Sequence, residues 1–140
     1  MTVLSNDEFA KQVMQLAKPV EPFEPVVTYD RDGDCIEFLS RADNFYAERI
    51  DDLVTVYYSQ ETNEVIGSLL KGVSKFCADL LEKMPALKIV IKDGPTKLEH
   101  IFLARLCSFD RPPGDMVTLT YRKLIKVADE SKAEAQLCLN

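Results

Sequence analysis

The sequence predicts an α+β fold in which a curled antiparallel sheet, arranged as a meander, carries two or three helices on one face. Short apolar runs with alternating character follow one another between residues 26 and 70. The polar turns between them are too short for crossover helices, so neighbouring strands should be antiparallel. A strong helix signal follows only after Ser74, which places the helices mainly after the sheet.

The length and composition favour a single domain over residues 1–140. A chain of 140 residues, of which 46% are hydrophobic, can bury roughly two-thirds of its unfolded surface in one core. Its expected parts are an N-terminal helix (5–18), a Pro-rich connector (19–25), a core of sheet and helices (26–128) and a frayed or weakly helical tail (129–140).

The N-terminal helix is predicted from a capping box and an apolar stripe. Ser5 is followed three residues later by Glu8, a typical start of a helix. Apolar residues then recur at helical spacing, at Phe9, Val13 and Leu16. Three prolines between residues 19 and 25 cannot continue that helix, so the connector should be extended.

The strands are predicted in order along the first half of the chain. Val26–Tyr29 and Cys35–Ser40 flank a turn rich in aspartate and glycine, which indicates a hairpin. The next strand-like runs are Phe45–Ile50, Leu53–Ser59 and Val65–Leu70.

The second half should be mainly helical, with two further strands. Ser74 is expected to cap a helix that Pro85 ends, and residues 87–91 alternate like a strand. Residues 97–106 suit a helix or a buried strand, and a second capping box favours the helix. Residues 116–127 alternate again, which predicts a final long strand or a bent pair.

One segment resembles a known family. Tyr29-Asp30-x-x-x-Asp34-x-Ile36-x-Phe38, followed by Val65-Ile66-Gly67, is similar to the Y-D-x-x-x-D-x-[LI]-x-[IF] opening and I-x-G ending of a small bacterial family of uncharacterised strand-rich domains. The likeness covers residues 26–74, about a third of the chain. Residues 60–63 depart from it, because the family often has an acidic turn there. The resemblance implies a curled antiparallel sheet and carries no known activity.

Charge and cysteine content limit the partners and the compartment. A formal net charge of −6 opposes non-specific attraction to nucleic acid or to anionic lipid, so neither is an expected partner. The four cysteines form no C-x-x-C pair, which is typical of reduced thiols. The start of the chain has no basic region and no long apolar run, so we expect a cytoplasmic protein.

The aspartate turn is the most evident candidate for a metal site. Asp30, Asp32 and Asp34 alternate, as ligands of a hard cation often do. An EF-hand would need glycine at its sixth position and glutamate at its twelfth, but Gly33 is fourth from Asp30 and Arg41 stands twelfth. We therefore interpret these aspartates as hydrogen-bonded turn residues and predict no metal.

Catalytic residues cannot be assigned from a motif, and no nucleotide fingerprint indicates a cofactor. His100 is the only histidine, so it is a candidate acid or base. A carboxylate pair drawn from Asp30, Asp34 and Glu48 is another. These residues support the alternative hypothesis of a small hydrolase-like enzyme.

The aromatic strands support the main hypothesis. Tyr46, Tyr57 and Tyr58 concentrate large side chains on two strands, and Tyr57 and Tyr58 must point to opposite faces. One should be in the core and the other on the surface, where tyrosine is a good contact residue. We expect a protein-interaction or accessory domain that acts as a homodimer or a subunit. A further alternative is a small-ligand carrier with its site between the sheet and the helix at residues 76–84.

Overall fold

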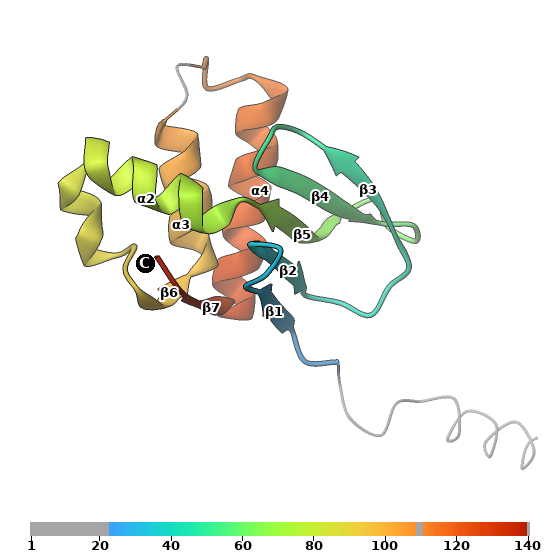
Figure 1. Cartoon of the computed structure of the whole chain (residues 1–140). Coiled ribbons are helices and arrows are strands. Elements are labelled where there is room, and N and C mark those ends of the chain that lie inside the picture. Colours follow the sequence, from blue (N-terminus) through green and yellow to red (C-terminus); the bar gives the residue numbers. More distant parts are fainter. Residues whose placement is uncertain (1–22, 109–110, 140) are drawn as a thin grey trace, which may run out of the picture.

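A sheet and a layer of helices make up the computed structural model, which describes residues 23–108 and 111–139 (Figure 1). The predicted α+β class, with an antiparallel sheet that is not closed, is confirmed. The strands of the main sheet are β1 (Val26–Asp30), β2 (Cys35–Leu39), β3 (Phe45–Arg49), β4 (Val54–Ser59) and β5 (Val65–Lys71). The predicted helix at 5–18 and most of the predicted connector lie outside the described residues.

The strand order is β1-β2-β5-β4-β3, with every neighbouring pair antiparallel. It departs from a simple meander at one point, because β5 lies between β2 and β4. The burial of the strands accounts for this order. Five of the seven residues of β5 are buried, as suits a central strand, whereas β3 has only Phe45 half-buried and suits an edge.

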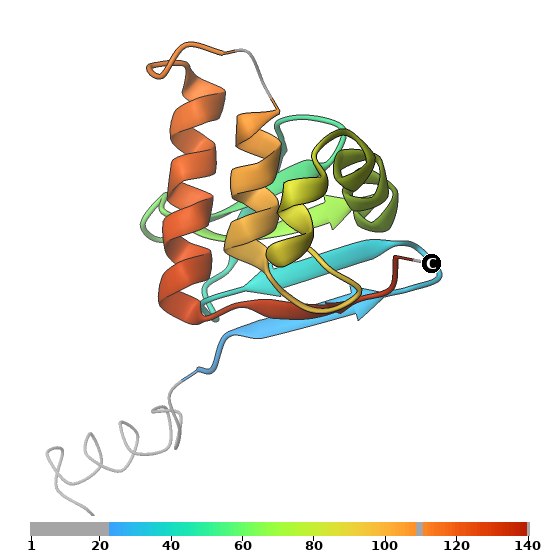
Figure 2. The ribbon, with the colours of Figure 1, turned by 90° about the vertical axis from the view of Figure 1, so that its left-hand side faces the viewer.

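The remaining elements follow β5 in sequence. They are α2 (Val73–Lys83), the 3₁₀ helix η1 (Pro85–Ile89), β6 (Gly94–Lys97), α3 (Leu98–Cys107), α4 (Met116–Ser131) and β7 (Glu134–Leu137). The three α-helices lie on one side of the main sheet, as the two perpendicular views show (Figures 1 and 2). We call the opposite side the outer face. Among the described residues, none of the helices is long and apolar enough to cross a membrane.

The predicted helix at 97–106 is confirmed as α3, but the predicted strand at 116–127 is wrong, because these residues form α4. The alternation that suggested a strand covers only five residues. A helical period runs through the whole segment, and the buried side chains that follow it are Thr118, Tyr121, Leu124 and Ala128. The longer pattern determines the structure because it supplies one continuous face for packing.

Two smaller predictions are also wrong. Residues 87–91 are not a strand, since Pro85 begins η1, and Ile89, at 81% exposure, points away from the core. The described part of the tail, residues 129–139, is more than a weak helix. It continues α4 to Ser131 and then forms β7, which pairs with β6 and lies beside β1 (Figure 2).

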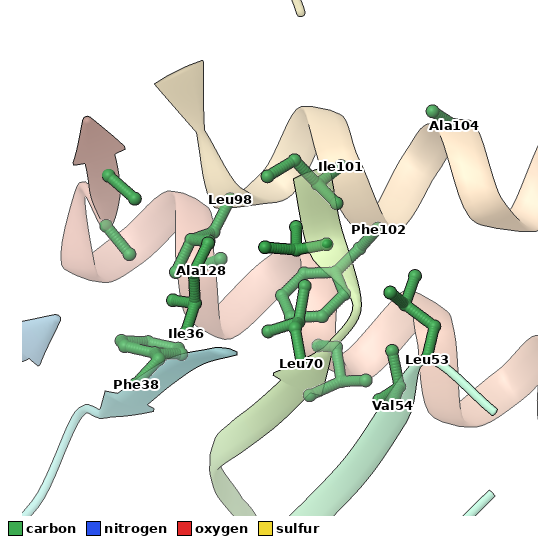
Figure 3. Packing of buried hydrophobic residues seen from close by; sticks show 14 of the residues in the cluster. Ile36, Phe38, Leu53, Val54, Leu70, Leu98, Ile101, Phe102, Ala104 and Ala128 are labelled. Carbon is green, nitrogen blue, oxygen red and sulfur yellow. The ribbon is translucent and has the colours of Figure 1, made fainter. Parts of the chain in front are cut away.

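The core lies between the sheet and the helices. Leu98, Ile101 and Phe102 of α3 point toward Ile36 and Leu70 of the sheet (Figure 3). All five side chains are fully buried. Each contributes roughly 1.5–3 kcal/mol relative to an exposed position, so this interface fixes the two layers together.

Candidate functional site

The three tyrosines chosen from the sequence lie on the paired strands β3 and β4. Tyr46 and Tyr58 are opposite each other and stack on the helix-facing side, with ring centroids 5.3 Å apart. Tyr57 stacks with Phe45 on the outer face, at 4.3 Å. The two faces of this pair of strands therefore each carry one aromatic stack.

Tyr57 is only 5% exposed, although it lies on the outer face. Its hydroxyl donates a 2.8 Å hydrogen bond to Glu37 Oε2 on β2, so the ring extends across β5. The residue beneath it on β5 is Gly67, which has no side chain to obstruct the ring. Burial, and then the Glu37 carboxylate, raise the pKa of Tyr57, which keeps the hydroxyl a donor.

Of the three tyrosines, Tyr46 presents the most accessible ring, at 43% exposure. Tyr58 is half-buried beneath the helices, and burial is the main cause that raises its pKa. Tyr46 also donates a hydrogen bond to Asn63 Oδ1 at 3.2 Å. That bond and the stack on Tyr58 hold the ring in one position beside β3.

β3 ends the strand order, and among the described residues only β4 pairs with it. Asn44 O accepts from Gln60 N at 2.8 Å, and Ile50 N donates to Val54 O at 3.1 Å. Backbone groups alternate in direction along an antiparallel strand, so the even-numbered residues of β3 face β4. The N–H and C=O groups of Phe45, Ala47 and Arg49 therefore point away from β4, and the Phe45 carbonyl accepts a hydrogen bond from Gln60 Nε2 at 3.3 Å.

The aspartate turn makes hydrogen bonds within the fold. Asp30 Oδ1 accepts from the backbone N–H groups of Asp32 and Gly33, at 3.1 and 3.3 Å. The two carboxylate oxygens of Asp34 accept from Ser74 N, at 3.0 and 3.1 Å. The prediction that the Ser74 side chain caps α2 is wrong, since Gly72 is the N-cap and Asp34 satisfies the first turn from a distant hairpin.

The predicted catalytic candidates do not converge. Asp30 and Glu48 lie on β1 and β3, the two outermost strands, which strand spacing places about 19 Å apart. Their side chains also belong to opposite faces of the sheet. His100 lies on α3, half-buried, and only Asp30 and Asp34 share one turn. Within the described ranges, His, Cys, Asp and Glu form no group of three that could hold a metal ion.

A polar cluster that the sequence did not reveal lies at the end of the helices. Asp51 accepts from Leu53 N and Val54 N, both at 2.8 Å, and from the Tyr121 hydroxyl. Arg105 Nε lies 3.6 Å from Asp51 Oδ2. Burial, and then Asp51, raise the pKa of Tyr121. The cluster joins the β3–β4 loop to α3 and α4. The Tyr121 hydroxyl remains a hydrogen-bond donor to Asp51, so the role of the cluster is structural.

A hollow of about 410 Å³ opens beside α2. It lies between α2 and the end of α3, whereas the ligand-carrier hypothesis places its site between α2 and the sheet. The residues that line it are Phe76, Asp79, Leu80, Lys83, Met84, Arg105, Cys107 and Ser108. Charged side chains at its rim distinguish it from an enclosed apolar pocket.

Comparison with protein-family models, with curated proteins and with solved structures found no match to this chain. The resemblance of residues 26–74 to a strand-rich bacterial family therefore remains a prediction from its motif.

Proposed function

We propose that this domain works by protein contact, and that its contact is a homodimer formed by the β3 edges of two copies. The observation that carries the proposal is the outward direction of the backbone N–H and C=O groups of Phe45, Ala47 and Arg49. Such an edge is a template for a further strand. The other edge strand, β1, has β7 beside it, so β3 is the more accessible of the two.

The residues of β3 suit pairing with a second copy. If the two β3 strands pair antiparallel about a two-fold axis at Ala47, Ala47 lies opposite the partner's Ala47. Phe45 then lies opposite the partner's Arg49. Because 45, 47 and 49 are the outward residues, each would exchange both backbone hydrogen bonds with its opposite residue. Tyr46 then faces the partner's Glu48, and no like charges lie directly opposite.

The tyrosines support this contact in different ways. Tyr46, exposed and held against Tyr58, lies beside the new strand pair and supplies apolar area with a polar tip. Tyr57 holds Phe45 in place on the outer face. The enzyme hypothesis draws no support from the separated positions of Asp30, Glu48 and His100.

Ala47→Pro tests the edge. Proline removes an N–H group that points outward in the single copy, so the β3–β4 hydrogen bonds are kept. We expect light scattering after size-exclusion chromatography to give a dimer mass for the unmodified chain and a monomer mass for Ala47→Pro. Ala47→Thr, which keeps the N–H and suits a strand, is the matched control and should remain dimeric.

Charge pairing tests the register. Ala47→Lys and Ala47→Glu each place like charges opposite across the two-fold axis, so each variant alone should be monomeric. Mixing the two should restore a heterodimer, which native mass spectrometry detects by its mass. A strictly monomeric unmodified chain at high concentration would exclude the homodimer. A dimer unaffected by both charge variants would place the contact elsewhere.

A further inference from the structure

The outer face of the main sheet has an apolar centre. Side-chain alternation from the pairing register places Leu39, Phe45, Tyr57 and Leu69 on it, from four different strands. Val26 of β1 joins them and is 48% exposed. The α-helices of the described residues all lie on the opposite face (Figures 1 and 2). An apolar sheet face of this kind usually has a covering element.

The sequence before β1 contains a segment suited to cover it. At 3.6 residues per turn, the apolar residues from 7 to 18 fall within an arc of about 160° on a helix. They are Phe9, Ala10, Val13, Met14, Leu16 and Ala17. The polar residues, which occupy the remaining arc without overlap, are Asp7, Glu8, Lys11, Gln12, Gln15 and Lys18. This separation is typical of a helix that packs one face against a protein surface.

The position of the connector directs that segment to the outer face. Phe23 lines a hollow of about 500 Å³ beside the β2–β3 loop, together with Leu39 and Phe45, both outer-face residues. Only residues 19–22 separate Phe23 from the end of the predicted helix. A linker this short holds the segment at an effective concentration in the millimolar range near its own sheet. Binding to the sheet of the same chain is therefore favoured over binding to the sheet of a second copy.

The dimensions also agree. A helix of residues 5–18 is about 21 Å long at 1.5 Å per residue. Five strands at about 4.8 Å spacing measure about 19 Å from first to last. One such helix therefore crosses the whole sheet.

We propose that residues 5–18 bind as a helix to the outer face of their own sheet, with Phe9, Val13 and Leu16 against Leu39 and Leu69. This site is distinct from the proposed β3 contact, which uses backbone groups at the edge of the sheet. Neither proposal requires the other, so a monomeric chain leaves this one intact.

The chain has no tryptophan, so an introduced one is a unique fluorescent probe. Phe9→Trp places it on the apolar arc, and Gln12→Trp, the matched control, places it on the polar arc. In the full chain we expect Phe9→Trp to emit at shorter wavelength than Gln12→Trp and to be quenched by acrylamide several-fold less. Similar emission and quenching of the two would overturn the proposal.

A second substitution locates the contact. Adding Leu69→Asp to the Phe9→Trp probe should shift its emission to longer wavelength, while far-UV circular dichroism confirms that the sheet is intact. Val26→Asp, at an exposed outer-face position, serves the same purpose if Leu69→Asp unfolds the protein. Unchanged emission in a folded double variant would overturn the proposal. An emission shift that appears only with dimer formation would also overturn it, since the partner's segment would then be the occupant.

Discussion

Gly67 of β5 lies against the backbone of β2 and leaves no room for a side chain. A Cβ atom at this position would lie 2.1 Å from the backbone oxygen of Phe38, a contact that no side-chain rotation relieves. We expect Gly67→Ala to lower the free energy of unfolding by about 1–3 kcal/mol, because the strands must move apart. Urea unfolding measures this change.

Gly114→Ala is the matched control for Gly67→Ala. The added Cβ would have no heavy atom within 4 Å, so the change should stay within about 0.5 kcal/mol. Equal losses in the two variants would contradict the close approach of the strands at Gly67.

At the scale of one element, the start of α2 depends on a residue from another hairpin. Asp34 has φ of 51°, a left-handed conformation, and its carboxylate accepts from Ser74 N. We expect Asp34→Ala to lower the free energy of unfolding by about 1–2 kcal/mol, the usual cost of losing a helix cap. A further loss should follow because alanine is strained in the left-handed conformation. Asp34→Asn should cost less, since asparagine tolerates this conformation and keeps an acceptor. Urea unfolding followed by circular dichroism measures both.

Asp32→Ala provides the comparison within the same turn. Asp32 is exposed, and its backbone N–H, which the substitution keeps, is the group that bonds to Asp30. Loss of the Asp32 carboxylate should change the free energy of unfolding by only a few tenths of a kcal/mol. If Asp32→Ala and Asp34→Ala were equally destabilising, the turn itself, and not the cap of α2, would explain the effect.

The elements differ in how far the sequence predicts them. All five strands of the main sheet could be predicted because short apolar runs and turn residues agree there. In α4, alternation over a few residues competed with a helical period over twelve, and only packing of Tyr121 and Leu124 on the sheet decides between them. The cap of α2 could not be predicted, since Asp34 and Ser74 are 40 residues apart.

At the scale of the whole molecule, the fold class followed from the order of the segments, whereas the contacts between layers did not. Asp51, Arg105 and Tyr121 meet only once the β3–β4 loop, α3 and α4 are packed, so no spacing in the sequence indicates them. The outward backbone groups of β3 likewise depend on the strand order, because a meander would have placed β2 beside β3. Long-range packing therefore determines the proposed contact surface.

The packed core also predicts how stability depends on pH. Burial raises the pKa of the Cys77 thiol from 9.0 to about 12. Between these values the folded state holds a proton that the unfolded chain has lost, so the free energy of unfolding falls as pH rises. This contribution is fully present below pH 9 and is lost toward pH 12. Urea midpoints should therefore be level from pH 7 to pH 8.5 and decrease above about pH 9.

Cys77→Ala isolates this effect. The variant should be less stable at neutral pH, because Cys77 is fully buried, but its stability should fall less steeply between pH 9 and pH 10. The ordinary pKa of tyrosine is 10, and burial raises the pKa of Tyr121 above it in the folded state. Below pH 10 the buried tyrosines are therefore mostly protonated in both the folded and the unfolded state, so they contribute little to the slope. Alkylation at pH 8 gives an independent check, because the exposed Cys107 should react first and Cys77 only on unfolding. An unchanged slope in Cys77→Ala, or early alkylation of Cys77, would contradict a close-packed core around α2.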